Sequence, residues 1–337
     1  MTSADSRTEG GFYAQDEIFL HDKLRFVIGA RADKFTSIDG VVLSPRAAIL
    51  IKPVADHAFR LSYNRAFRAP SAINNHIEVT ITEPFAFSRI NPAFAPLGVY
   101  FVPIAVNGNP DLQEERLDAY EIGYTGIVGR ATLTAAYYMN EFKDQILFTQ
   151  TGEHSILVPP PGWPAAFGPT LPGSAIWASV QSSAHFPSSY SYRNFGTMTQ
   201  KGLELGVDTA VNDRINAFVN YSWQGTPEPK DFDLSELNIP AEHRFNAGFN
   251  FNVARVLGSL GVSYVDEAFW QDVLDSRYHG TTDAYTMVNG SVGIRFGTRN
   301  RAQLMLKGTN LTNETIQQHI FGDIIKRQLA AELRFNF

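Results

Sequence analysis

The stretch HRFNAGFNFN, from His243 to Asn252, alternates between apolar residues and residues that are polar or glycine. Such a period of two predicts a β-strand, because successive side chains of a strand point to opposite faces of its sheet. Soluble proteins usually have strands of about 5–6 residues. This stretch instead matches the roughly 9–11 residues with which a tilted strand crosses a bilayer. Its apolar face carries Phe245, Ala247, Phe249 and Phe251.

The same alternation recurs along most of the chain, for instance in KLRFVIGARAD (23–33) and RATLTAAYYMN (130–140). A period of two that persists over so many segments predicts an all-β protein. We expect about 13 strands, near residues 10–20, 23–34, 43–52, 57–65, 116–128, 130–142, 197–211, 213–223, 243–252, 255–265, 285–296, 301–311 and 323–337.

The connections between these strands fall into two groups. Tight turns lie at 20–23, 53–56, 128–130, 211–213, 252–255 and 297–300. Longer connections alternate with them, at 35–42, 66–115, 143–196, 224–242, 266–284 and 312–322. A soluble sandwich with one wetted face has the same strand pattern but no such segregation of connections. Short turns at one end and long loops at the other are typical of an outer-membrane barrel. The sequence therefore predicts an antiparallel transmembrane β-barrel.

Composition excludes several other classes of protein. The 337 residues include no cysteine, so disulfides and thiolate metal sites are excluded, and the net charge of −6 gives no basic face for nucleic acid. No apolar run is long enough for a membrane helix, and the first residues have no apolar core of a signal peptide. We find no catalytic constellation, no histidine spacing typical of a metal site and no cofactor motif, and we expect a protein that is not an enzyme.

A series of motifs occurs in an order that resembles the TonB-dependent outer-membrane receptor family. Each motif alone is weak, but together they cover nearly the whole chain. They are GGFYAQDEIFLHDKLRFVIGARAD (10–33), LSPRAAILIKP (43–53) followed by LSYNRAFRAPS (61–71), GNPDLQEERLDAYEIGYTG (108–126), KGLELGVD (201–208), HRFNAGFNF (243–251), LKGTNLTNE (306–314) and ELRFNF (332–337).

The resemblance implies a barrel of about 22 strands that is closed by a plug domain. With about 13–14 strands and no plug, the sequence is expected to be the C-terminal portion of such a barrel. Closed barrels of one bacterial chain have an even number of strands, and an odd count also favours an incomplete barrel. We expect a disordered or truncated start over residues 1–9 and barrel strands over 10–337.

The resemblance also implies a function and a set of partners. We expect a receptor in the bacterial outer membrane that takes up a scarce small-molecule ligand, with a ferric siderophore as the commonest ligand of the family. Haem, cobalamin and oligosaccharide are alternatives, as are a passive porin or structural barrel and a surface-adhesion role. The implied partners are outer-membrane lipid, the barrel-assembly machinery and, through a missing N-terminal region, the TonB energy-transducing complex.

Candidate ligand-binding residues lie in the long connections. Arg68 belongs to the Phe67–Pro70 box, and His76 lies between that box and Asn109-Pro110-Asp111-Leu112. In haem receptors of the resembled family, similar boxes bracket a histidine that ligates iron, although they also occur in receptors of other ligands. His279, in another connection, is a further candidate because a neutral imidazole binds metals and haem iron.

The connection at 143–196 is rich in proline and aromatic residues. Trp163, Phe167 and Trp177 offer rigid apolar faces that suit a planar ligand or a sugar. A long loop that packs its own aromatic side chains gives the same composition, and the sequence leaves both alternatives open.

The last predicted strand carries Leu333, Phe335 and Phe337 on its apolar face. In the resembled family, a last strand that ends on an aromatic residue is the signal by which the assembly machinery recognises a barrel. We expect these three residues to form that assembly signal.

Overall fold

A computed structural model describes residues 8–230, 232, 234, 237–271, 279–297 and 301–335. Thirteen long strands run side by side in one antiparallel sheet, in the order in which they occur in the sequence. They are β1 (Glu9–His21), β2 (Leu24–Phe35), β3 (Val42–Val54), β4 (His57–Arg68), β7 (Glu115–Val128), β8 (Ala131–Glu153), β11 (Pro187–Asn212), β12 (Ile215–Gln224), β14 (His243–Val253), β15 (Val256–Val265), β18 (Tyr285–Phe296), β19 (Ala302–Thr309) and β22 (Gln328–Phe335).

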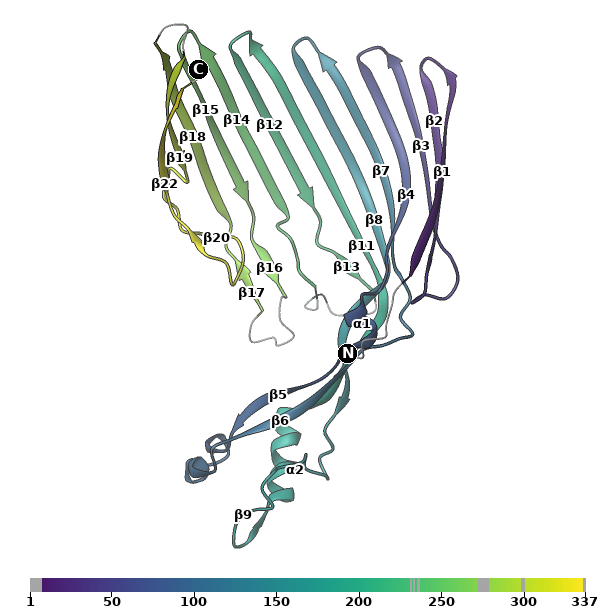
Figure 1. Ribbon diagram of the computed structural model, residues 1–337, viewed down its shortest axis with the longest axis vertical. Coiled ribbons are helices and arrows are strands. Elements are labelled where there is room, and N and C mark those ends of the chain that lie inside the picture. Colours follow the sequence, from purple (N-terminus) through teal and green to yellow (C-terminus); the bar gives the residue numbers. More distant parts are fainter. Residues whose placement is uncertain are drawn as a thin grey trace.

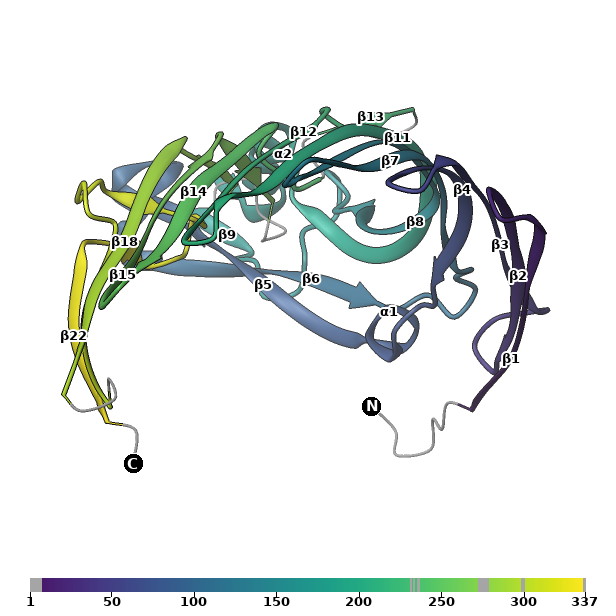
Figure 2. The ribbon, with the colours of Figure 1, turned by 90° about the horizontal axis from the view of Figure 1, so that it is seen from above.

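The sheet curves into an open arc (Figures 1 and 2), with β1 at one edge and β22 at the other. The predicted all-β fold with antiparallel strands is confirmed. Within the described part of the chain, no helix is long and apolar enough to cross a membrane. Glu9 already belongs to β1, while residues 1–7 of the expected disordered start lie outside the described residues.

The two faces of the sheet differ in polarity. Phe245 lies opposite Tyr221 on β12 and Tyr264 on β15, and directly opposed residues of antiparallel strands share a face. Phe245 and Phe249 are 38% and 40% exposed. We call the face that carries these two residues the apolar face and the opposite one the polar face. In an outer-membrane barrel the apolar face contacts lipid.

Charged residues of the polar face pair across neighbouring strands. Arg60 on β4 pairs with Glu121 on β7, and Lys307 on β19 pairs with Glu332 on β22. These pairs satisfy the charges where two strands meet, and they add to the backbone ladder that fixes the register.

The long connections contain structure that the sequence did not predict. β8 and β11 pair with each other along their whole length, from Ala131 and Thr209 to Glu153 and Pro187. With 23 and 26 residues, both strands extend well past the ends of their neighbours. A hairpin of β5 (Glu78–Ala86) and β6 (Val99–Asn107) is added to this extension, because β6 pairs in parallel with β11. Figure 1 shows this unit projecting from one end of the sheet. We call residues 78–107 and 145–195 the arm.

Short elements complete the fold. In the arm these are the 3₁₀ turns Phe87–Arg89 and Pro92–Leu97, β9 (Ala166–Gly168), β10 (Leu171–Pro172) and α2 (Gly173–Ala184). Near the sheet they are α1 (Ala72–His76), β13 (Glu228–Pro229), β16 (Ala268–Trp270), β17 (Gly280–Thr282), β20 (Ile316–Gln317) and β21 (Ile324–Ile325).

The arm has its own hydrophobic core, which is built from aromatic side chains. Trp177 of α2 is fully buried, and its ring centroid lies 5.1 Å from that of Trp163. Burial raises the pKa of the Tyr100 phenol, whose hydroxyl donates a hydrogen bond of 2.8 Å to the Pro161 carbonyl. The buried members of this core are Phe85, Phe87, Tyr100, Val102, Trp163, Phe167, Trp177 and Phe186.

Candidate ligand-binding site

A cavity of about 640 Å³ opens on the polar face, at the end of the sheet that carries the long connections. The ends of β14, β15 and β18 form its wall, and β16 and β17 lie beside them. We call this cavity the mouth pocket. It is lined by Asn238, Ile239, Pro240, Ala241, Arg244, Asn246, Val265, Asp266, Ala268, Phe269, Trp270, Thr282, Tyr285 and Gln318.

Hydrogen bonds between distant segments hold the pocket together. Ile239 and Phe269 exchange two backbone hydrogen bonds of 2.9 Å, which ties the segment before β14 to β16. The Trp270 indole donates to the Thr282 hydroxyl at 3.0 Å, across the β16–β17 hairpin. Gln318 donates to the Tyr285 hydroxyl at 2.8 Å. The side chains of Trp270 and Tyr285 are therefore fixed by partners at their polar ends, and Phe269 is fixed through its backbone.

The chemistry of the pocket combines aromatic faces with charge. Arg244 lies on the polar face, opposite Ser222 on β12 and Val265 on β15. A guanidinium recognises anionic oxygen pairs and stacks on planar rings. Asp266 is the carboxylate of the lining, and the Tyr264 hydroxyl donates to it at 3.3 Å. The arrangement suits a ligand that is largely apolar or aromatic and carries anionic oxygens.

Of the residues predicted from the sequence, His279 lies beside this pocket, against Phe269, although it is not itself a lining residue. Its ring centroid is 6.1 Å from that of Phe269, and a second histidine, His319, lies 4.6 Å from the Trp270 ring. Arg68 and His76 are not among the lining residues. The Arg68 guanidinium pairs with Glu115 at 2.7 Å, and His76 is an exposed residue at the end of α1.

Trp163, Phe167 and Trp177 lie in the core of the arm, where they are 8%, 9% and 0% exposed. The Trp163 indole donates to the Gly173 carbonyl and the Trp177 indole to the Ser155 carbonyl, both at 2.8 Å. Of the two alternatives that the sequence left open, the structure therefore has the loop that packs its own aromatic residues. These rings pack against one another in the core of the arm.

The sequence did not indicate the other pocket residues. Arg244, the neighbours Phe269 and Trp270, and Tyr285 come from three strands, β14, β16 and β18, and form no local motif. Trp270 and Tyr285 lie in or beside a long connection, which is the only signal that could have identified them. Leu333 and Phe335 of the expected assembly signal lie on β22 and are 54% and 56% exposed, while Phe337 lies outside the described residues.

A wall of long antiparallel strands with one apolar face, short turns at one end and long connections at the other defines a β-barrel protein of the bacterial outer membrane. The sequence matches the family described as TonB dependent receptor-like, beta-barrel over residues 1–311. The chain belongs to this family, whose members are receptors of the outer membrane. No curated protein matches the chain in sequence.

Solved structures of similar fold come from several bacteria. A mutant of the ferric enterobactin receptor PfeA from Pseudomonas aeruginosa has a TM-score of 0.69 at 12% identity, over 98% of this chain and 45% of that chain. The siderophore receptor PirA from Acinetobacter baumannii has 0.68 at 15% identity, over 98% and 46%. The FrpB iron transporter from Neisseria meningitidis has 0.64 at 14% identity, over 98% and 45%. The chain thus spans less than half the length of these proteins.

Proposed function

We propose that the chain forms part of the wall of a receptor that takes up a ferric siderophore across the outer membrane. The observation that carries this proposal is the mouth pocket, in which Arg244 and aromatic side chains converge on the polar face. Family membership supports it, as do the names of the similar structures, which include a ferric enterobactin receptor, a siderophore receptor and an iron transporter.

The chemistry of the pocket fits this class of ligand. Many ferric siderophores are anionic complexes in which aromatic or apolar groups surround the metal. Arg244 supplies a fixed positive charge, while Phe269, Trp270 and Tyr285 supply flat apolar surface. A pocket of about 640 Å³ is in the size range of small-molecule sites, which is roughly 300–1,000 Å³.

Uptake against a gradient requires parts beyond the sheet. We propose that a plug domain gates the barrel, and that the TonB energy-transducing complex supplies the energy through a region outside this chain. Leu333, Phe335 and Phe337 are proposed as the assembly signal, because the first two are apolar and exposed on the last strand, β22.

Binding of ferric siderophores to the purified full-length receptor tests the proposal. Quenching of Trp270 fluorescence by the ferric complex reports the Kd, and W270F identifies that signal. We expect R244Q to raise the Kd of the bound siderophore about tenfold, since a charged hydrogen bond is worth about 1.5–3 kcal/mol. R214Q, in the short turn before β12, is the control. An unchanged Kd in R244Q would contradict the role of the pocket.

Haem is a second candidate, favoured by the two histidines that approach the pocket. His279 contacts Phe269 and His319 contacts Trp270. If haem is the ligand, H279A with H319A will abolish the shift of the haem absorption band on binding, and siderophores will not bind. Cobalamin and oligosaccharides belong in the same binding panel, because an aromatic pocket also suits a corrin ring or a sugar.

A further inference from the structure

The connection between β19 and β22, residues 310–327, supplies part of the mouth pocket. Its two short strands, β20 and β21, pair with each other and bring two side chains to the pocket. Gln318 lines the pocket and donates to the Tyr285 hydroxyl at 2.8 Å, and the His319 ring centroid lies 4.6 Å from that of Trp270. We call residues 310–327 the last loop.

Asn310, the first residue of the last loop, joins the two halves of the loop through its side chain. Asn310 is 0% exposed. Its amide nitrogen donates to the Glu314 carbonyl at 2.8 Å and to the Ile325 carbonyl at 3.2 Å, and its amide oxygen accepts the Glu314 backbone N–H at 3.1 Å. Glu314 precedes β20, and Ile325 belongs to β21 on the returning side. A single buried amide group therefore closes the loop at its base.

The backbone of the last loop turns through two residues with left-handed conformation. Asn310 has a φ of 51° and Asn313 a φ of 57°. Asparagine adopts this conformation more readily than other side chains apart from glycine. The Asn313 side-chain oxygen accepts the Arg327 backbone N–H at 3.2 Å, which ties the end of the loop to its start. Both asparagines belong to the motif LKGTNLTNE (306–314).

The last loop is also fastened to the end of β18 that leads to the pocket. The Asn310 backbone N–H donates to the Asn289 side-chain oxygen at 3.0 Å. The Glu314 carboxylate accepts the Thr286 backbone N–H at 3.1 Å. These contacts advance along β18 towards its first residue, Tyr285, which lines the pocket. The loop is thus aligned with the pocket from its base.

We propose that Asn310 is a positioning residue of the mouth pocket, which keeps the last loop closed and so holds Gln318 and His319 at the pocket. Without the amide, the carbonyls of Glu314 and Ile325 lose the donor that they share, and the loop opens. A ligand then binds only the fraction of molecules in which the loop is closed, which weakens its apparent affinity. The effect on binding rests on the proposed siderophore uptake, whereas closure of the loop does not depend on a ligand.

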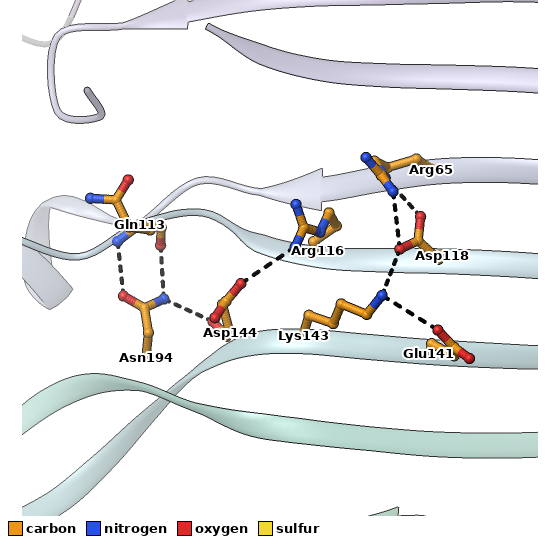
Figure 3. A network of polar contacts seen from close by, with 8 residues as sticks. All are labelled: Arg65, Gln113, Arg116, Asp118, Glu141, Lys143, Asp144 and Asn194. Atoms are coloured by element: carbon orange, nitrogen blue, oxygen red, sulfur yellow. Dashed lines mark hydrogen bonds and ion pairs between the residues drawn. The ribbon is translucent and has the colours of Figure 1, made fainter. Parts of the chain in front are cut away.

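Another asparagine closes a different long connection in a similar way and provides a comparison. The Asn194 side chain accepts the Gln113 backbone N–H at 2.8 Å and donates to the carbonyls of Gln113 and Asp144 at 3.0 Å and 2.8 Å (Figure 3). Asn194 lies on β11 at the base of the arm and is not a lining residue of the mouth pocket. It therefore allows the same substitution away from the pocket.

Hydrogen exchange of the full-length receptor without ligand tests the closure of the loop. N310D keeps the size of the side chain but replaces the donor with an oxygen that faces two carbonyls. We expect exchange over 314–325 to rise about tenfold, while β14 and β15 stay protected. N313D is the matched control, because its side chain still accepts from Arg327 and the loop should stay closed. Unchanged exchange over 314–325 in N310D would overturn the proposal.

N194D separates this effect from a general loosening of the long connections. Exchange should rise at the base of the arm, around Gln113 and Asp144, and should stay as in the wild type over 314–325. Equal rises over 314–325 in N194D and N310D would show that Asn310 has no specific hold on the last loop, and would overturn the proposal.

Binding of a ferric siderophore shows what the closed loop does for the pocket. The Kd, measured by quenching of Trp270, should rise about tenfold in N310D and stay at the wild-type value in N313D. A disulfide should restore binding, because it holds the loop without the amide. The chain has no cysteine, and a Cβ atom on Gly280 of β17 would lie 3.3 Å from the Ile320 side chain, so G280C/I320C joins β17 to the last loop.

The rescue distinguishes positioning from any other loss of structure. In N310D with the oxidised G280C/I320C pair, the Kd should return to the wild-type value, and reduction should raise it again. A Kd that stays raised in the oxidised form would overturn the proposal. If the wild type binds no ferric siderophore, the proposed function fails, and the exchange measurement still decides whether Asn310 closes the loop.

N310G serves as a second variant where N310D does not assemble in the membrane. Glycine adopts the φ of 51° without strain, removes the amide and adds no charge. Exchange over 314–325 and the Kd should therefore rise in N310G as they do in N310D. A raised Kd without faster exchange over 314–325 in either variant would overturn the proposal.

Discussion

Asp118 is a carboxylate on the apolar face of the sheet, yet it is only 1% exposed. A buried carboxylate is costly unless donors surround it. Tyr63, Arg65 and Lys143 supply these donors from the two strands next to β7. One side chain thereby links three strands at the level where the lipid-facing surface becomes aqueous.

Replacing Asp118 by alanine should lower the free energy of unfolding by about 2 kcal/mol, because Arg65 and Lys143 lose their shared partner. The cost stays below that of a fully buried ion pair, since both cations are about one third exposed. The urea midpoint of folding in lipid vesicles, followed by heat-modifiable migration in gels, measures the change.

The matched control for this substitution is D213N. Asp213 pairs with Arg130 in a short turn, where its side chain is 90% exposed, so its loss should cost less than about 0.5 kcal/mol. Equal midpoints for D118A and the wild type would show that the network contributes nothing to stability.

Strand β14, whose sequence predicted the fold, also allows the most direct test of its orientation. The chain has no cysteine, so single cysteines for spin labels can be introduced without background. Labels at Ala247 and Phe249 should be accessible to oxygen dissolved in lipid, and labels at Asn246 and Asn250 to a water-soluble nickel complex. Accessibilities without this alternation would contradict the assignment of the faces.

The arm depends on Trp177, the fully buried residue of α2. W177A should destabilise the arm by about 3–5 kcal/mol, because it opens a cavity in the aromatic core and removes the indole bond to Ser155. Hydrogen exchange should then rise over 78–107 and 154–186 while β14 and β15 stay protected. L157A is the control, since Leu157 is 80% exposed. A rise that spreads equally over the whole sheet would contradict an independently packed arm.

The strands of the sheet could be predicted from the sequence because lipid on one side and polar surroundings on the other impose alternation. The arm could not be predicted in this way. In β6, Tyr100, Val102, Ile104 and Val106 are buried, but Phe101, Pro103 and Ala105 between them are also apolar. The alternating burial of β6 therefore does not appear as alternating polarity in the sequence. The proline-rich segment before α2 predicts a loop.

The candidate site was harder to predict than the fold. Arg244 gives no local signal, because it is one of many polar residues that alternate along strands. The pocket exists only where β14, β16, β17 and β18 meet, and strand register decides which side chains converge. Of the candidate binding residues predicted from the sequence, His279 alone lies near the pocket. Trp163, Phe167 and Trp177 were predicted because they are large aromatic residues in a long connection, but a small core outside the membrane also needs large side chains.

At the scale of the whole molecule, the sheet is an open wall. Among the described residues, β1 pairs with β2 and β22 with β19, and each has one edge without a strand partner. Unpaired backbone groups cost several kcal/mol each in lipid, so a stable barrel requires further strands against both edges. The similar structures, of which this chain spans less than half, support the proposal that this wall belongs to a larger barrel.

The most direct test of the proposed siderophore uptake is the measurement of iron uptake by cells that lack the gene. The deletion strain should fail to grow on at least one ferric siderophore under iron limitation and should not accumulate its radioactive iron. The wild-type gene should restore uptake, and the R244Q gene at equal surface level should restore it only in part. Normal growth of the deletion strain on every iron source, on cobalamin and on glycans would contradict the account.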